Sequence, residues 1–296
     1  MYPSTLRRVS ILGSGVIGTS IALALRRSGI RVALSDRDGD VVAKAVLMGA
    51  GVALAPDDPP ADVVVIATPP STVVPVLRDA QARGLGAVYT DVASTKARIV
   101  AEAERAGCDL TTYVPGHPMG GRELSGPFAA RADLFTGRPW ALCPHAATPP
   151  GHLHLVAELV AVCGGEPEVL APSTHDRVVA AVSHAPHVVA AALAAGFAGA
   201  DETMLSLVGR GLQDATRIAT GDPELWCDIL EQNADAVAVV LETVVRELSQ
   251  AAHALRSLDH AGAGALADLL ARGNRGRDRI VGTWPARRVE KAGLRA

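Results

Sequence analysis

The segment VSILGSGVIGTSIALAL most constrains the fold, because Gly13, Gly15 and Gly18 follow one apolar run and open a helical one. This G-x-G-x-x-G spacing at a strand-to-helix turn is typical of dinucleotide binding. Gly13 permits the tight turn, Gly15 lets the backbone approach a pyrophosphate, and Gly18 lets the helix pack closely on the sheet. We expect Val16 and Ile17, the first helical residues, to present free N–H groups to the phosphates.

An acidic residue, Asp36, ends the second predicted strand roughly 20 residues after the glycines, where a carboxylate can bind the adenosine ribose. This favours NAD, because the carboxylate would repel a 2′-phosphate. Arg37 follows and could stack on adenine or tolerate NADP, so NADP stays open as the alternative. Thr68 and Pro69, after a later strand, could line the cofactor's path. The competing interpretation is a glycine-rich turn in an α/β protein that binds no nucleotide.

Strand-like and helical stretches alternate through the first part of the chain and then give way to helices alone. The strand-like runs are 9–12, 32–34, 63–67, 87–89, 140–143 and 168–170, and the helical ones are 16–27, 41–48, 96–106 and 154–163. Continuous apolar strands alternating with helices predict a mostly parallel sheet covered on both faces. Later helical stretches are 178–198, 203–208, 223–248 and 252–270, with one short strand-like run at 280–281. We expect a Rossmann-type α/β domain over 1–171 and an all-α domain over 172–296.

Composition excludes several classes of function. The 296 residues carry a net charge of −3, so nothing favours nucleic-acid binding. Four widely spaced cysteines without a CxxC pair argue against a zinc ribbon or a disulfide scaffold, and fit a reducing cytoplasm. Without an N-terminal signal core or an uninterrupted apolar stretch of about 20 residues, we expect no membrane insertion and no export.

Two further segments follow predicted strands, where ligands bind in open α/β sheets. YTDVASTK carries Asp91, Ser94 and Lys96, and YVPGHPMGG carries His117 after the apolar pair Tyr113–Val114. Strand ends can aim Ser94 and His117 into one crevice, with His117 as a catalytic histidine beside the cofactor. The alternatives are a helix N-cap for Ser94, a role it could also combine with the first, and a structural loop histidine for His117.

The helical half offers two pairs of polar residues. His184 and His187 lie at i, i+3 around Pro186, which should interrupt or kink the helix. Such a pair can be half of a metal site, but no third ligand follows at suitable spacing, so we expect no metal. Asp214 and Arg217 also lie at i, i+3, and either form a surface ion pair or place the guanidinium in a cleft.

These residues resemble the prephenate/arogenate dehydrogenase family of tyrosine biosynthesis over nearly the whole chain. The resemblance rests on GSGVIGTS, DVASTK, GHPMGGRE, SHAPH and DATRIATGDPELW. It implies an NAD(P)-binding domain joined to a helical dimerisation domain, hence a homodimer, with the active site between the domains. It further implies that His117 is catalytic, that the family's active-site serine falls on Ser94, and that its substrate-binding arginine falls on Arg217. The family's paired histidines fall on His184 and His187, and we include Asp214, beside the arginine, among the expected substrate-binding residues.

The resemblance implies oxidative decarboxylation of prephenate by NAD⁺ to 4-hydroxyphenylpyruvate. His117 would act as the base on the 4-hydroxyl, Ser94 would hydrogen-bond the same group, and Arg217 would hold a carboxylate. Arg122, where relatives often carry a small polar residue, would suit the keto acid prephenate over arogenate if it faces the pocket. Arogenate and 4-amino-4-deoxyprephenate are the alternative substrates. A non-catalytic NAD-binding protein is less consistent with Ser94, His117 and Arg217 together. A 3-hydroxyacid dehydrogenase would typically use a lysine in the helical domain, and between Met48 and the C-terminal tail the only lysine is Lys96, in the N-terminal domain.

Overall fold

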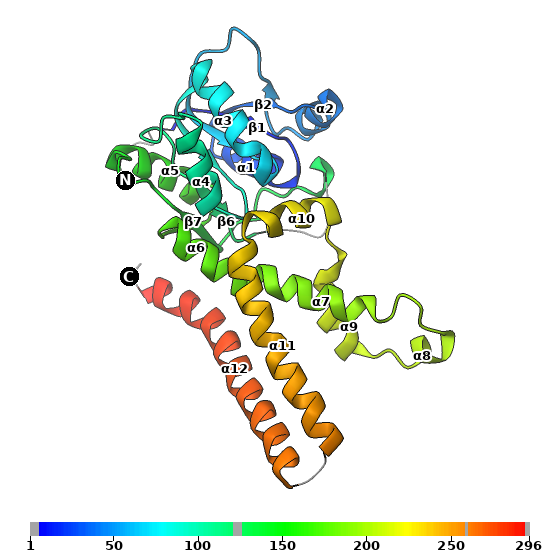
Figure 1. Ribbon diagram of the computed structural model, residues 1–296. Helices are drawn as coiled ribbons and strands as arrows, with labels where there is room; N and C mark the ends of the chain where they lie inside the picture. Colours follow the sequence, from blue (N-terminus) through cyan, green and yellow to red (C-terminus); the bar gives the residue numbers. More distant parts are fainter. Residues whose placement is uncertain (1–5, 121–125, 258–259, 294–296) are drawn as a thin grey trace. The chain divides into compact units, whose positions relative to one another are not determined.

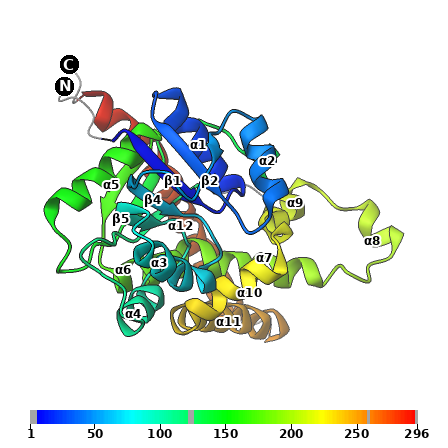
Figure 2. The same ribbon diagram turned by 90° about the horizontal axis from the view of Figure 1, so that it is seen from above.

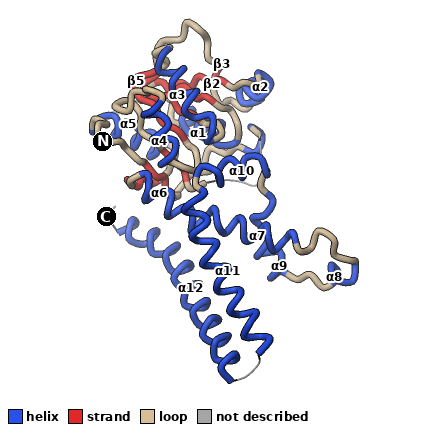
Figure 3. Tube along the Cα trace, viewed as in Figure 1, coloured by secondary structure: helices blue, strands red, loops and turns tan. Residues whose placement is uncertain are grey.

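The computed structural model describes residues 6–120, 126–257 and 260–293 (Figure 1). The chain divides into two compact units, residues 1–237 and 238–296. Strands occur in the first part of the chain, and every regular element described after β8 is helical (Figure 3). The predicted fold class, a Rossmann-type α/β domain followed by helices, is confirmed.

A parallel five-stranded sheet forms the centre of the first unit. Its strands are β1 (Arg8–Leu12), β2 (Arg31–Ser35), β3 (Val52–Ala53), β4 (Ala61–Ile66) and β5 (Gly86–Asp91). They lie in the order β3-β2-β1-β4-β5, which is the order of the first five strands of a dinucleotide-binding sheet. The middle residues of β1, β2 and β4 are buried, as expected for strands covered on both faces.

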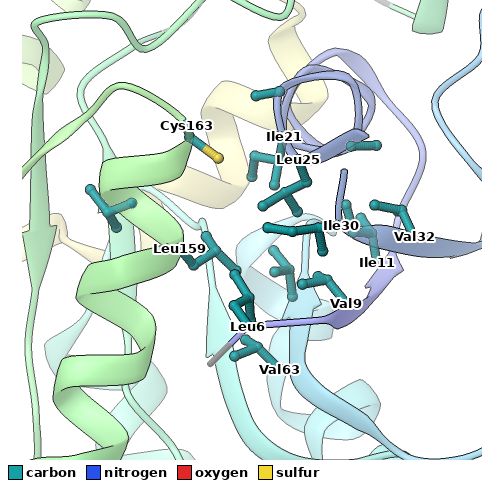
Figure 4. Close-up of a cluster of buried hydrophobic side chains, with 14 of the residues drawn as sticks. Leu6, Val9, Ile11, Ile21, Leu25, Ile30, Val32, Val63, Leu159 and Cys163 are labelled. Atoms are coloured by element: carbon teal, nitrogen blue, oxygen red, sulfur yellow. The ribbon is translucent and has the colours of Figure 1, made fainter. Parts of the chain in front are cut away.

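Helices cover both faces of this sheet (Figure 2). They are α1 (Val16–Arg27), α2 (Gly39–Leu47), α3 (Val73–Ala82), α4 (Ala97–Arg105) and α5 (Pro150–Val162), with the short turn η1 (Pro70–Thr72) before α3 and η2 (Pro127–Ala129) further on. On one face Ile21 and Leu25 of α1 pack with Leu159 of α5 and Val9 of β1 (Figure 4). The other face packs against α3 and α4. These two apolar layers fix the positions of the loops at the strand ends.

The first unit contains a second sheet, which has three strands. It contains β6 (Gly116–Pro118), β7 (Pro139–Leu142) and β8 (Glu166–Val169), with β6 antiparallel to β7 and β7 parallel to β8. The segment before β6 also touches the first sheet, because Tyr113 forms a parallel bridge with Tyr89 of β5. The chain thus runs directly from the edge of one sheet into the other.

The rest of the first unit is helical. It contains α6 (Pro172–Val179), a π-helical turn η3 (Ala180–His184), α7 (Ala185–Ala195), α8 (Glu202–Ser206), α9 (Arg210–Thr216), a 3-10 turn η4 (Arg217–Thr220) and α10 (Pro223–Gln232). By length and composition alone, Pro172–Ala195 could cross a membrane, a test that a core helix also passes. A third of its apolar window is buried in the structure, and the segment carries the buried polar residues His175, Asp176 and His184.

Two long helices, α11 (Ala234–Ser257) and α12 (His260–Gly293), make up the second unit, and the boundary falls inside α11. Arg272 of α12 forms an ion pair with Glu247 of α11 at 2.8 Å. The strand-like run at 280–281 is helical, because two β-branched residues without a longer apolar run cannot override the helical segment around them. The predicted helix 223–248 is broken at Asn233, which leaves the helical conformation at the end of α10.

Candidate active site

The glycine loop between β1 and α1 is shaped for close approach. Gly13 has φ of +105°, and a Cβ there would lie 2.3 Å from the carbonyl oxygen of Ala67. A Cβ on Gly18 would lie 2.0 Å from the carbonyl oxygen of Gly13, so this helix position also requires glycine. A Cβ on Gly15 would meet nothing within 4 Å. The loop is therefore tight towards the protein and open where a ligand would sit.

Polar groups around this opening fit a dinucleotide. The hydroxyls of Ser14 and Thr68 are buried and lack a hydrogen-bond partner among the described residues. Val16 and Ile17 begin α1, whose N-cap Gly15 offers no side chain to occupy their N–H groups. Hydroxyls and helix N-terminal N–H groups are the donors that bind a pyrophosphate. The donor set therefore fits the phosphates of NAD.

Asp36 lies directly after β2, at the carboxyl end of the sheet. One carboxylate oxygen accepts the Ser14 N–H at 2.7 Å and the other accepts the Asp38 N–H at 3.1 Å. These bonds hold the carboxylate beside the glycine loop, at the place where it can bind a ribose diol. Arg37 is exposed next to it, and Pro69 is exposed beyond β4.

His117 is placed differently from the sequence interpretation, which put it in a loop after a strand of the main sheet. It is the middle residue of β6, opposite Ala141 of β7. The neighbouring Gly116 allows the two sheets to approach, because a Cβ there would lie 2.8 Å from the carbonyl oxygen of Asp91. The side chain is 9% exposed, and its Nδ1 lies 2.9 Å from Nε2 of His175.

His175 and Asp176, adjacent in α6, were not recognised from the sequence. Nδ1 of His175 lies 2.7 Å from Oδ1 of Asp176. The carboxylate of Asp176 also accepts the backbone N–H groups of Lys96 and Ala97, both at 2.8 Å, at the start of α4. A His–Asp pair in the first turns of a helix was the available signal, but nothing in the sequence showed which strand it would face.

This geometry corrects one interpretation of Ser94. Ser94 does not cap α4, because Asp176 supplies the acceptor for the first N–H groups of that helix. Ser94 is half-buried in the segment between β5 and α4. A buried ion pair between Lys96 and Asp91 holds this segment at both ends.

The Lys96–Asp91 pair belongs to a larger buried cluster. The second oxygen of Asp91 accepts the hydroxyl of Tyr113 at 2.6 Å. Burial, followed by the charge of Asp91, holds the pKa of Tyr113 well above its usual value of 10.0, so the phenol stays a donor. Each of the three side chains thus has a partner inside the cluster, which a buried charge requires. Asp91 and Lys96 flank Ser94 in the chain, and Tyr113 lies four residues before His117, so the cluster ties the two segments together.

His184 and His187 share one aromatic neighbour. The ring of His187 stacks on Trp226 of α10 with centroids 3.5 Å apart, and the ring of His184 meets the same indole edge-on at 6.3 Å. The π-helical turn lies directly before Pro186: the N–H of Ala185 bonds to the carbonyl of Ala180, five residues back. Pro186 therefore interrupts the regular helix as predicted, because it has no N–H to give.

Asn233 connects this pair to α6. Its Nδ2 donates to the carbonyl oxygen of Asp176 at 2.8 Å and lies 3.2 Å from Nδ1 of His184. Nε2 of His184 is buried without a partner among the described residues. Burial lowers the pKa of His184 to about 4, so its ring is neutral near neutral pH.

Arg217 begins η4, the turn that packs against α7, and its side chain is exposed. The next residue, Ile218, contributes a backbone hydrogen bond to His187, so Arg217 lies beside the stacked pair. Asp214 is exposed on α9, one turn earlier. Arg122 lies outside the described residues, and its proposed contact with substrate stays a prediction. Within the described ranges, no group of three or more His, Cys, Asp or Glu side chains could hold a metal ion.

The electrostatics of His117 suit a base. Burial, followed by unfavourable electrostatic interactions with His175, Lys96 and His184, lowers its pKa well below 6.5. The ring is therefore neutral at neutral pH and can accept a proton. A nucleotide-binding fold that carries a buried neutral imidazole defines the class: an NAD-dependent dehydrogenase.

Comparisons with known proteins narrow the class. Residues 21–169 match the nucleotide-binding domain of prephenate dehydrogenase, and residues 171–271 match the dimerization domain. The chain therefore belongs to the prephenate dehydrogenase family. NovF of Streptomyces niveus, a probable prephenate dehydrogenase, is 38% identical over 94% of this chain and 79% of its own length.

Two solved structures share the fold at 28% identity. Prephenate dehydrogenase from A. aeolicus, in complex with hydroxyphenyl propionate and NAD⁺, has a TM-score of 0.80 and covers 92% of this chain and 98% of its own. Arogenate dehydrogenase from Synechocystis has a TM-score of 0.74 and covers 92% of this chain and 99% of its own. The family, the dehydrogenase activity and the NAD cofactor predicted from the sequence are thus confirmed.

Proposed function

We propose that this chain oxidises prephenate with NAD⁺ and releases carbon dioxide, giving 4-hydroxyphenylpyruvate for tyrosine biosynthesis. The observation that carries this proposal is the buried, neutral ring of His117, held in a strand beside a nucleotide-binding sheet. The relatives that are named prephenate dehydrogenases support the choice of substrate.

The chemistry requires little from the protein beyond a base and correct positioning. His117 accepts the proton of the C4 hydroxyl as that carbon becomes a carbonyl carbon, a contribution of about 10²–10⁴-fold. Bound NAD⁺ supplies the acceptor for the hydrogen and electron pair that leave C4. The bond from the ring to its carboxylate then breaks, its electron pair makes the ring aromatic, and the proton returns to the C4 oxygen. Ser94, on the segment that Lys96 and Asp91 hold, hydrogen-bonds the same oxygen.

The rest of the substrate is a dianion, and the residues around α7 suit it. Arg217 can hold a carboxylate with two parallel hydrogen bonds, and the His184 ring, whose Nδ1 faces the amide of Asn233, leaves Nε2 to donate. The stacked rings of His187 and Trp226 form a flat wall of the same region. Asp214 lies one turn from Arg217 and can orient it.

Arogenate is the second candidate substrate, supported by the likeness to the Synechocystis arogenate dehydrogenase. 4-Amino-4-deoxyprephenate is a third, because the same removal of hydrogen from C4 applies to it. Arogenate carries an ammonium group where prephenate carries a keto group, so an acidic residue near the side chain would favour it. The cationic Arg122 favours prephenate if it faces the pocket.

The experiment is the rise in NADH absorbance with purified protein, NAD⁺ and either prephenate, arogenate or the 4-amino analogue in parallel. We expect a fast rise with prephenate and a rate at least tenfold lower with the other two. A faster rise with arogenate or with the amino analogue would transfer the proposal to that substrate. No rise with any of them, while NAD⁺ binds, would contradict the proposed reaction.

We also propose that the enzyme is a homodimer. The match of residues 171–271 to a dimerization domain supports it. So do large apolar side chains that are exposed on the helices of the second unit, among them Val239, Val245, Leu248, Leu270 and Ile280. Light scattering should give twice the 30.4 kDa of one chain. A mass of one chain at micromolar concentration would contradict this.

A further inference from the structure

Three buried groups form a continuous hydrogen-bonded chain behind His117. Oδ1 of Asp176 lies 2.7 Å from Nδ1 of His175, and Nε2 of His175 lies 2.9 Å from Nδ1 of His117. His175 is 1% exposed, and Asp176 is 5% exposed. Water is therefore excluded from both hydrogen bonds, and within the part of the chain that the structure describes each ring nitrogen of His175 has one side-chain partner.

The positions of the protons in this series of hydrogen bonds can be assigned by starting from Asp176. The carboxylate of Asp176 is an acceptor only, and it already accepts two backbone N–H groups, so Nδ1 of His175 must carry the proton of their shared bond. A neutral His175 then has its lone pair on Nε2. The proton between the two rings therefore belongs to Nδ1 of His117.

The reverse arrangement is unfavourable. His175 could donate to His117 only with protons on both of its own nitrogens, which makes it a buried cation. That cation would lie in the same cluster as the buried ammonium of Lys96, which already acts on His117. Burying a second positive charge there has a large desolvation cost.

We propose that His175 and Asp176 are positioning residues that hold His117 in one tautomer, with the proton on Nδ1 and the lone pair on Nε2. The inference rests on the proposed function, because only a base needs that lone pair. When Nε2 takes the proton of the C4 hydroxyl, the Nδ1 proton stays on His117 in its bond to Nε2 of His175, and this bond, backed by the carboxylate of Asp176, stabilises the positive charge on His117. No electrons are exchanged along the chain, and the proton returns the same way when the phenol forms.

The experiment must separate a positioning role of His175 and Asp176 from a purely structural one. Asp176 does serve the fold, because it also caps α4, so replacing it would confuse two effects. The described side-chain hydrogen bonds of His175 are those to His117 and Asp176, and its other described bond, N–H to the carbonyl of Ala171, is made by the backbone. His175 is therefore the residue to change. His175→Gln keeps an oxygen that can accept from His117, whereas His175→Leu keeps the bulk and removes the acceptor.

The first measurement is the ¹⁵N spectrum of histidine-labelled holoenzyme with NAD⁺, with the His117 signals identified from a His117→Asn sample. We expect a protonated Nδ1 and an unprotonated Nε2. A ring protonated on Nε2, or a His175 protonated on both nitrogens, would overturn the proposal. The spectrum needs no turnover, so a correct tautomer in a protein inactive on prephenate would contradict only the proposed function.

The second measurement is steady-state kinetics. We expect His175→Leu to lower kcat by about 10²–10⁴-fold, the range for losing a general base. His175→Gln should recover at least tenfold of that loss, and KM for NAD⁺ should change less than about threefold in both. His154→Leu, at an exposed histidine of α5, is the matched control. Equal activity of the Gln and Leu variants, or wild-type kcat in the Leu variant, would overturn the proposal even where the variants fold normally.

Discussion

Burial governs the chemistry of His117. Its pKa is lowered first by loss of water and then by unfavourable electrostatic interactions with His175, Lys96 and His184. A base works only when neutral, and an imidazole is neutral above its pKa. With His117 as the proposed base, the lowered pKa would extend the working range of the enzyme towards acid pH.

The pH dependence of kcat/KM for prephenate tests this directly. Activity should persist as the pH falls below 6.5, the ordinary pKa of histidine, and should be lost only when the pH passes the lowered value. The acid limb reports the essential base in the free enzyme. An acid limb centred at 6.5 or above, in the absence of unfolding, would show that the base is not this buried ring.

Arg217 is the second residue for which we propose a specific role. Arg217→Ala should raise KM for prephenate by roughly 10–100-fold, because a hydrogen-bonded charge contributes about 1.5–3 kcal/mol. Arg217→Lys should restore only part of the affinity, since lysine lacks the planar pair of donors. KM for NAD⁺ should stay constant.

Arg210→Ala is the matched control, because Arg210 is an exposed arginine at the start of α9, close in sequence. Its KM for prephenate should equal that of the wild type. If Arg217→Ala left KM for prephenate unchanged and raised KM for NAD⁺ instead, the guanidinium would bind the cofactor and not the substrate.

Single residues of the site were predictable where the chemistry has a local signature. The glycines and Asp36 follow from spacing along one strand–turn–helix unit, so the sequence contains the whole argument. His175 was not predictable, because its role depends on a contact with His117, 58 residues earlier in the chain. The same holds for Asp176, which caps a helix that begins 79 residues before it.

Among the elements, α10 is attached to the nucleotide-binding part of the first unit by few polar contacts. Asp228 of α10 accepts the N–H of Ser71 at 3.0 Å and its hydroxyl at 2.9 Å, in the turn η1. Arg98 of α4 donates to the carbonyl of Glu231 at 3.2 Å. Trp226 lies on the same helix as Asp228, and η1 begins just after Thr68 and Pro69. These contacts therefore fix the position of Trp226 relative to the residues expected to line the cofactor's path.

Breaking the Asp228–Ser71 contact should loosen this arrangement. Asp228→Ala should raise KM for both NAD⁺ and prephenate several-fold and lower the free energy of unfolding by about 1 kcal/mol, because the pair is partly exposed. Glu231→Ala, on the exposed side of the same helix, is the control. Ser71→Ala combined with Asp228→Ala should show a coupling energy, and strictly additive effects would contradict a direct contact.

Elements with a strong apolar period were predicted well. Helix α1 begins and ends as expected, and β1, β2, β4 and β5 differ from the prediction only at their ends. The two-residue strand β3 and the helix α3 were not predicted. β6 was missed because it has only three residues, the last of them a proline, and so few residues carry no period. The break at Asn233 was missed because it depends on hydrogen bonds to His184 and Asp176, which lie far away in sequence.

The whole molecule consists of two units that the chain joins inside one helix. The groups that bear on the proposed chemistry, from the glycine loop to Arg217, belong to the first unit, whereas α12 and most of α11 form the second. The match to the nucleotide-binding domain ends at residue 169 and the match to the dimerization domain begins at 171, well before the boundary between the two units at 237/238. The domain boundary at 171/172 therefore stays a prediction about folding, and the proposed catalytic role does not depend on it.

The central claim is that His117 makes this nucleotide-binding fold a dehydrogenase. The most direct test measures kcat with prephenate and the dissociation constant of NAD⁺ on the same samples of wild-type protein and His117→Asn. We expect kcat to fall by about 10²–10⁴-fold while the dissociation constant for NAD⁺ is unchanged. A variant whose kcat stays within about threefold of wild type would show that another group removes the proton.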